Sequence, residues 1–162
     1  MDSEEQLFQE RYPEMLKMAQ LLTSKTDAVL IGSLGTYLTY PQVLAARPHD
    51  VDLFVEGSFD NIKKIIAILK DNGYTVYSWQ DEISENFDFS ILSGRFYIRG
   101  IKDGLYIDAT YEIVGLAFEE IRKYVVSSEN ILALNKEGQI IVLDLCDRED
   151  TAKRVSLLKK LI

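Results

Sequence analysis

The sequence predicts an α/β fold of the α+β kind, with a short mixed β-sheet flanked by helices. Helical spacing of apolar residues dominates both ends of the chain, whereas residues 74–110 alternate with a period of two. The short apolar run at 28–31 has the length of a buried strand, and residues 50–55 are expected to form the next strand. Strands and helices in this order are expected to form a sheet covered by helices.

The length of 162 residues fits one domain, and 47% of the residues are hydrophobic, which is enough for a proper core. We therefore expect a single domain over residues 1–162, with a helical C-terminal tail from about residue 113.

The net charge of −8 limits the partners that this chain can bind. An acidic chain is repelled by nucleic acid and by anionic membranes, so extended nucleic-acid binding and membrane binding are not expected. A small nucleotide is still allowed, because a metal ion can bridge carboxylates to phosphates. The single cysteine, the acidic start of the chain and the lack of a long apolar run favour a cytoplasmic protein.

The first half of the chain is expected to begin with a helix that Pro13 could split. The strand 28–31 ends at Gly32, and a helix follows through Leu38 to a break near Pro41. The strand 50–55 comes next. Asp60 is expected to cap a helix that ends at 72–73.

The second half is expected to begin with strands at 74–79 and 87–91. The segments 95–101 and 105–110 should form a hairpin around Asp103-Gly104, a turn signal. The remainder is expected to be mainly helical. One helix would run from a cap at Ser128 to Gly138 and another over 150–161, while 139–145 fits a helix or a strand.

The pair Gly32-Ser33 is the first feature that points to chemistry. It stands between a buried strand and a helix, where free N–H groups and the positive end of the helix dipole favour phosphate. Gly32 would let the backbone approach an anion closely, and Ser33 would donate its hydroxyl or cap the helix. A plain capped turn explains the same pattern.

Three aspartates form the second feature. Asp50 and Asp52 are two residues apart in a predicted strand, so their side chains should point the same way. Two close carboxylates repel each other unless a cation lies between them, and hard oxygen ligands favour Mg²⁺ or Mn²⁺. Asp108 could join them if its strand is a neighbour. A solvated strand end is the alternative.

Together these motifs resemble the DNA polymerase β-like nucleotidyltransferase superfamily. The resemblance rests on Gly32-Ser33 before a helix, on the Asp50-Val51-Asp52 strand and on a later strand with Asp108. The stretch 47–52 is similar to the corresponding strand of small antibiotic nucleotidyltransferases and related minimal bacterial proteins.

The resemblance implies a role for each of these residues. Gly32 and Ser33 would hold nucleotide phosphates, and Arg47 would contact a phosphate. Asp50 and Asp52 would hold one or two Mg²⁺ or Mn²⁺ ions, while Asp108 would bind the second metal and act as general base. The implied enzyme moves a nucleoside monophosphate from a nucleoside triphosphate such as ATP to a hydroxyl acceptor, and pyrophosphate leaves.

The chain also departs from the family pattern. The spacing from Gly32 to Asp50 is long, and Leu34-Gly35 follows the turn where many antibiotic-type members carry a double glycine. The short tail after Asp108 leaves recognition of the acceptor, a small molecule or a protein hydroxyl, to that tail, to a partner protein or to a second subunit of a homodimer.

Two other functional classes fit the same residues. The first is a non-catalytic nucleotide- or metal-binding module on the same fold that acts with a partner protein. The second is a metal-dependent glycosyltransferase with an Asp-x-Asp motif, which the short chain disfavours because such enzymes usually need a longer sugar-nucleotide domain.

Overall fold

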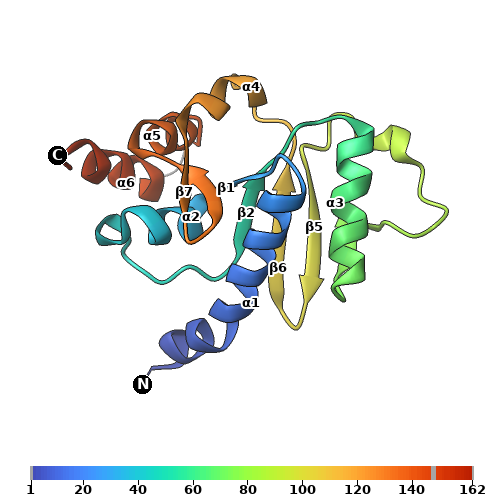
Figure 1. The fold of residues 1–162 in the computed structure, drawn as a ribbon, viewed down its shortest axis with the longest axis horizontal. Helices are drawn as coiled ribbons and strands as arrows, with labels where there is room; N and C mark the ends of the chain where they lie inside the picture. The colour runs from blue at the N-terminus through green and yellow to red at the C-terminus, as the bar shows by residue number, and fades with distance from the viewer. Residues whose placement is uncertain (1, 147–148, 162) are drawn as a thin grey trace.

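The computed structural model describes residues 2–146 and 149–161, and within them one mixed sheet organises the chain (Figure 1). Its eight strands run in the order β4-β3-β5-β6-β2-β1-β8-β7. The strands are β1 (Val29–Ile31), β2 (Val51–Phe54), β3 (Thr75–Ser78), β4 (Asp81–Glu82), β5 (Tyr97–Lys102), β6 (Leu105–Thr110), β7 (Val125–Ser128) and β8 (Ile131–Leu134).

Six α-helices and three short 3-10 turns connect these strands in the described residues. The helices are α1 (Ser3–Lys25), α2 (Gly32–Thr39), α3 (Phe59–Asp71), α4 (Phe118–Ile121), α5 (Lys136–Asp144) and α6 (Glu149–Lys159). The 3-10 turns are η1 (Pro41–Val43), η2 (Phe89–Leu92) and η3 (Arg122–Tyr124). Among the described residues, no helix combines the length and apolar character that a bilayer span requires.

One face of the sheet is covered by α1 and α3 (Figure 1). Strand residues of one parity, such as Val51, Leu53 and Ile107, join apolar residues of both helices in the main core. The 13-residue helix α3 contributes an apolar face of Ile62, Ile65, Ile66 and Leu69, which are spaced as one side of a helix requires.

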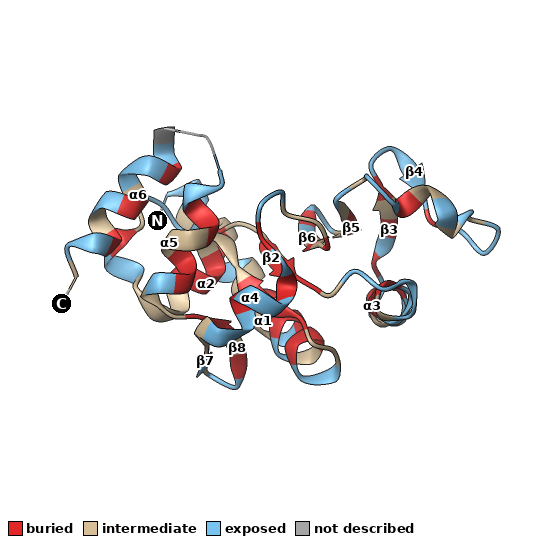
Figure 2. Ribbon diagram, turned by 90° about the horizontal axis from the view of Figure 1, so that it is seen from above, coloured by how far each residue is buried: buried red, intermediate tan, exposed pale blue. Residues whose placement is uncertain are grey.

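The other face is only partly covered. At the β1–β8 side, Val29, Phe54 and Leu134 pack with residues of α4 and α5 in a second, smaller core. Over β5 and β6 no helix lies on this face (Figure 2), where Arg99 and Asp108 are half-buried and Tyr106 is exposed. Of the predicted functional aspartates, Asp108 lies in this uncovered half, and Asp52 of the neighbouring strand β2 lies at its border.

The mixed sheet flanked by helices confirms the predicted fold class, but several element predictions were wrong. The helix α1 continues through Pro13. The cap of α3 is Ser58, whose side chain accepts the Asn61 N–H, and not Asp60. Residues 87–91 do not form a strand, because Asp88 accepts the Ser90 N–H and starts the 3-10 turn η2.

The predicted helix from Ser128 to Gly138 is also wrong. Residues 125–134 form the β7–β8 hairpin, and its turn residues Glu129 and Asn130 both have positive φ angles, of 52° and 61°. The apolar run Ile131–Leu134 is too short for its period to distinguish a helix from a strand. Burial beside β1 decides the matter: Leu30 and Ala133 pair in parallel.

Predictions for three other segments fit the structure, although the tail from residue 113 is not wholly helical because it contains β7 and β8. Strand 105–110 is β6, and its hairpin with β5 turns at Asp103 and Gly104, with φ angles of 50° and 79°. The ambiguous stretch 139–145 is helical as part of α5. The last helix, predicted over 150–161, is α6.

Candidate active site

A single row of paired residues crosses the middle of the sheet at the candidate site. Asp52 of β2 pairs with Ile31 of β1 on one side and with Asp108 of β6 on the other. Asp108 pairs in turn with Arg99 of β5. Side chains of directly opposite residues share one face, so Asp52, Asp108 and Arg99 all point to the uncovered face.

Gly32 lies directly against Asp52. Gly32 is the first residue of α2 and has a φ of +72°, a conformation that favours glycine. A Cβ atom placed on Gly32 would lie 2.6 Å from Asp52 Oδ2 and 3.0 Å from Asp52 Cβ. The glycine therefore serves two needs, the turn into α2 and the close approach of the Asp52 carboxylate to the start of this helix.

Asp50 is fixed by β6 rather than by its own strand. It precedes β2, and its Oδ1 accepts the backbone N–H of Tyr106 at 3.1 Å. This bond joins the residue before β2 to the start of β6. The predicted strand 50–55 thus begins one residue later than expected, at Val51.

Asp108 is held by Arg99 in a two-pronged ion pair. Arg99 Nε donates to Asp108 Oδ1 at 2.7 Å, and Arg99 Nη2 donates to Oδ2 at 3.0 Å. The hydrogen bond to Asp108 raises the pKa of Arg99 above its ordinary value. The guanidinium also lies over the Tyr106 ring, 4.5 Å from its centroid. Both Asp108 oxygens are thus occupied by a neighbouring cation.

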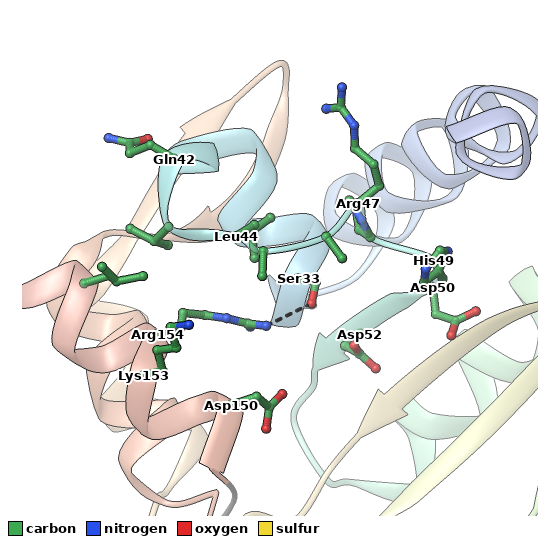
Figure 3. A pocket seen from close by; sticks show the side chains of 15 residues that line it. Ser33, Gln42, Leu44, Arg47, His49, Asp50, Asp52, Asp150, Lys153 and Arg154 are labelled. Carbon is green, nitrogen blue, oxygen red and sulfur yellow. Dashed lines mark hydrogen bonds between the residues drawn. The ribbon is translucent and has the colours of Figure 1, made fainter. Parts of the chain in front are cut away.

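A cleft of about 580 Å³ opens beside Asp50 and Asp52 (Figure 3). Ser33 lines it, and the loop from η1 to His49 forms one of its walls. Asp150, Lys153 and Arg154 of α6 form the opposite wall, and Arg154 Nη2 donates to Ser33 Oγ at 3.4 Å. Ser33 of the predicted phosphate turn and two of the three predicted aspartates therefore line one cavity.

Arg47 lines the same cleft, but its guanidinium is held elsewhere. Its Nε donates to Glu5 Oε2 at 3.0 Å and its Nη1 donates to the Tyr37 hydroxyl at 3.1 Å. Its side chain points away from Asp52 in Figure 3. The hydrogen bond to Glu5 raises the pKa of Arg47. In this arrangement Arg47 ties α1 to the loop and does not reach towards Ser33.

The three predicted metal ligands do not converge into one group. Within residues 2–146 and 149–161, no three His, Cys, Asp or Glu side chains come together in a way that could hold a metal ion. Asp52 and Asp108 are neighbours across two strands, and Asp50 and Asp52 share the cleft. Asp108 lies on the Arg99 side and does not line that cleft.

Sequence reasoning missed two features of this site. The Arg99–Asp108 pair follows from the hairpin register, because the turn makes Lys102 face Leu105 and the fourth pair from the turn is Arg99 with Asp108. Lys153 and Arg154 belong to the helix predicted over 150–161. That prediction rested on the spacing of its apolar residues and gave no role to its cations. Their position at the cleft depends on how α6 packs, which no local pattern reveals.

Comparisons with known proteins find similarity at the level of the fold. No protein-family model and no curated protein sequence matches this chain. The structure resembles JHP933 from Helicobacter pylori, with 14% identity and a TM-score of 0.53 over 96% of this chain and 67% of that protein. It also resembles the Megavirus polyadenylate synthase, with 11% identity and a TM-score of 0.53 over 99% of this chain.

This chain covers only 38% of the viral enzyme's length. A candidate nucleotidyltransferase from H. pylori aligns more weakly, at a TM-score of 0.49 and 16% identity over 87% of this chain and 59% of its own. The protein therefore shares its fold with JHP933 and with part of the Megavirus polyadenylate synthase.

Proposed function

We propose that this protein is a metal-dependent nucleotidyltransferase that moves a nucleoside monophosphate from a nucleoside triphosphate such as ATP to a hydroxyl acceptor. The observation that carries the proposal is the contact between Gly32 and Asp52. It sets a carboxylate at the start of α2, in a cleft that Ser33 and Asp50 also line. A helix start next to paired acids suits a phosphate chain bridged to carboxylates by a divalent cation.

The carboxylates present fit Mg²⁺ or Mn²⁺ completed by substrate. Mg²⁺ in nucleotide sites is usually held by one or two carboxylates together with phosphate oxygens and waters, rather than by an all-protein cage. Asp50 and Asp52 supply hard oxygen donors on the cleft side. Asp108 could add a ligand for a second ion, and its pairing with Arg99 competes with that role. The bound cation would neutralise negative charge as it develops on the phosphate oxygens.

The transfer step is an in-line displacement at phosphorus. The acceptor oxygen forms a bond to the α-phosphorus while the bond from that phosphorus to the bridging oxygen breaks, and pyrophosphate leaves with the bonding electrons. The acceptor proton passes to a carboxylate, and Asp108 is the one next to Asp52 on the uncovered face. Gly32 and Ser33 would hold the phosphates meanwhile.

The uncovered half of the sheet is the side from which an acceptor can approach. We propose a small molecule or a protein hydroxyl as acceptor, because the net charge of −8 disfavours an extended nucleic acid. A partner protein or a second copy of the chain would complete its recognition.

The Arg99–Asp108 pair favours a second candidate function, a nucleotide-binding module without turnover. A carboxylate that gives both oxygens to a guanidinium is a weaker base and a poorer metal ligand while the pair lasts. Binding without transfer, in the presence of an acceptor panel, would support this alternative.

The proposal is tested by thermal unfolding with and without Mg²⁺ and ATP. A ligand that binds only the folded state raises the melting temperature. Asp52→Asn should lose most of this rise, because it removes the charge that faces the start of α2. Asp60→Asn, an exposed site on α3, is the matched control. If Asp52→Asn responds like the parent protein, the nucleotide binds elsewhere.

Labelled nucleoside triphosphates and a panel of small-molecule and protein hydroxyl acceptors then test for transfer. Asp50→Ala serves as the inactive control. If the parent protein attaches label to an acceptor and Asp50→Ala does not, the result identifies both the reaction and the class of acceptor.

A further inference from the structure

The cleft has an uneven distribution of charge that the proposed aspartate site does not explain. Asp50 and Asp52 lie on the sheet side, whereas Lys153 and Arg154 lie on α6 across the opening (Figure 3). The chain as a whole has 26 acidic and 18 basic residues. Because the chain is acidic overall, a generally basic surface does not explain two adjacent cations at this cavity.

These two cations have no acidic partner in the described part of the chain. None of the ion pairs found there includes Lys153 or Arg154. Asp150, one turn earlier on α6, lines the cleft with them, so the wall is not purely basic. Within the described residues, the hydrogen bond found for Arg154 goes to the neutral hydroxyl of Ser33. A half-buried guanidinium of this kind retains most of its capacity to bind an anion.

The packing of α6 fixes the direction of these side chains. Val155 and Leu158 are buried with Val43 of η1 and Leu143 of α5 in a small core of their own. Arg154 precedes Leu158 by one helical turn, so it lies at the edge of this core. Arg154 therefore reaches the residue that follows Gly32, at the start of α2.

We propose that Lys153 and Arg154 bind the β- and γ-phosphates of a nucleoside triphosphate, between the start of α2 and α6. This inference rests on the proposed function and adds a polyphosphate subsite to it. A cation-bridged phosphate chain needs carboxylates at one end and positive side chains along the other, and the cleft offers both. Arg154 contributes a planar fork of donors, while Lys153 contributes a point charge.

If this subsite exists, the affinity for a ligand should depend on how many phosphates the ligand carries. A triphosphate reaches both the aspartates and α6, whereas a monophosphate reaches only one of them. The protein should therefore bind Mg²⁺-ATP and Mg²⁺-tripolyphosphate more tightly than AMP, and added salt should weaken the first two more than the last.

Isothermal titration of the full chain with Mg²⁺-tripolyphosphate, Mg²⁺-ATP and AMP tests the subsite. Lys153→Gln and Arg154→Gln should each weaken binding of the two polyphosphates about 10-fold or more, which is the usual loss for a hydrogen bond to a charged group. Binding of AMP should change less than about twofold. Lys159→Gln, an exposed site on the same helix, is the matched control and should bind all three like the parent protein.

The outcomes separate this inference from the proposed function. If the parent protein binds Mg²⁺-ATP and both cleft variants bind it equally well, α6 takes no part and the inference is wrong. If the parent protein binds neither polyphosphate, the proposed function fails together with the subsite. Because the Lys153 side chain is exposed, Lys153→Gln gives a result even if Arg154→Gln does not fold.

Discussion

At the scale of single residues, the site depends on a glycine that has no room for a side chain. Gly32 combines a positive φ with a carboxylate where its Cβ would be. The two properties can be separated, because Gly94 has a φ of +79° and nothing within 4 Å of the position of its Cβ. The pair Gly32 and Gly94 therefore distinguishes backbone strain from displacement of Asp52.

Both Gly32→Ala and Gly94→Ala should lower the free energy of unfolding by about 1–2 kcal/mol, the cost of a left-handed residue with a Cβ. Gly32→Ala should cost more than Gly94→Ala, because Asp52 must also move. Only Gly32→Ala should weaken Mg²⁺-ATP binding. Urea unfolding and calorimetric titration measure the two quantities, and equal binding by both variants would contradict the role given to the glycine.

Asp108 as general base and Arg99 as its ion-pair partner can both be tested by substitution. Asp108→Asn keeps the size of the side chain but removes its charge, so turnover should fall by about 10²–10⁴ if Asp108 is the general base. Nucleotide binding should stay within a few-fold of the parent value. The loss would then belong to the transition state, and single-turnover kinetics with a labelled nucleotide would measure it.

Arg99→Gln is the partner experiment. It frees Asp108, so turnover should persist or rise. Because the pair is partly exposed, with side-chain accessibilities of 34% and 18%, stability should fall by about 1 kcal/mol or less. If both variants lose the same stability and neither alters turnover, the pair only holds the β5–β6 hairpin together.

At the scale of elements, the sequence predicted best where a pattern is long or a turn is chemically specific. The Asp103-Gly104 turn fixed the β5–β6 hairpin, and the apolar spacing of α3 fixed that helix. Shorter patterns were ambiguous. The four-residue run Ile131–Leu134 became a strand because Ala133 pairs with Leu30 of β1, which is distant in sequence.

The same limit applies to the site. Strand parity and the family resemblance placed Asp52, Asp108 and Gly32 in one region, which local sequence can indicate. The cations of α6 and the hold of Glu5 on Arg47 are contacts between distant elements. Such contacts depend on how distant elements pack, so a short stretch of sequence cannot predict them.

The β7–β8 turn provides a prediction at this scale. Glu129 has a φ of 52°, which costs a non-glycine residue about 1–2 kcal/mol. Glu129→Gly should therefore stabilise the protein, although the greater freedom of glycine in the unfolded chain reduces the gain to about 0.5–1 kcal/mol. Chemical denaturation measures the change.

Glu137→Gly is the control for this substitution, since Glu137 is exposed in the first turn of α5. Glycine in a helix is unfavourable, so this variant should lose up to about 1 kcal/mol. The opposite signs at 129 and 137 distinguish a hairpin from the helix that the sequence suggested across this stretch. Two losses of similar size would favour the helix.

At the scale of the whole molecule, the C-terminal helices complete a cleft that begins at the sheet. The sheet and α2 supply Asp50, Asp52 and Ser33, and α6 supplies the facing wall. The helix α5 connects the two halves, because it packs on α6 and also contacts α2 through Gln139. The geometry of the cleft thus depends on a polar contact far along the chain from the aspartates.

Gln139 is the residue through which this connection can be tested. Its side chain is buried, with 6% exposed, and its Oε1 accepts the Thr36 hydroxyl at 2.7 Å. Its Nε2 donates to Thr39 Oγ1 at 2.7 Å and to the Leu134 carbonyl at 2.9 Å. One amide thereby joins α2, β8 and α5.

Gln139→Leu preserves most of the volume but removes all three bonds. It leaves the buried Leu134 carbonyl without the amide that donates to it, and the Thr36 hydroxyl keeps only its 3.3 Å bond to the Gly32 carbonyl. Each such group costs about 1–3 kcal/mol, so the loss of stability should be at least of that size. Gln80→Leu, at an exposed turn, should stay within about 0.5 kcal/mol of the parent protein. Urea unfolding with unchanged m-values would show that the folded state itself lost stability. If Gln139→Leu proved as mild as Gln80→Leu, the position of α5 and α6 against α2 would depend on apolar packing alone.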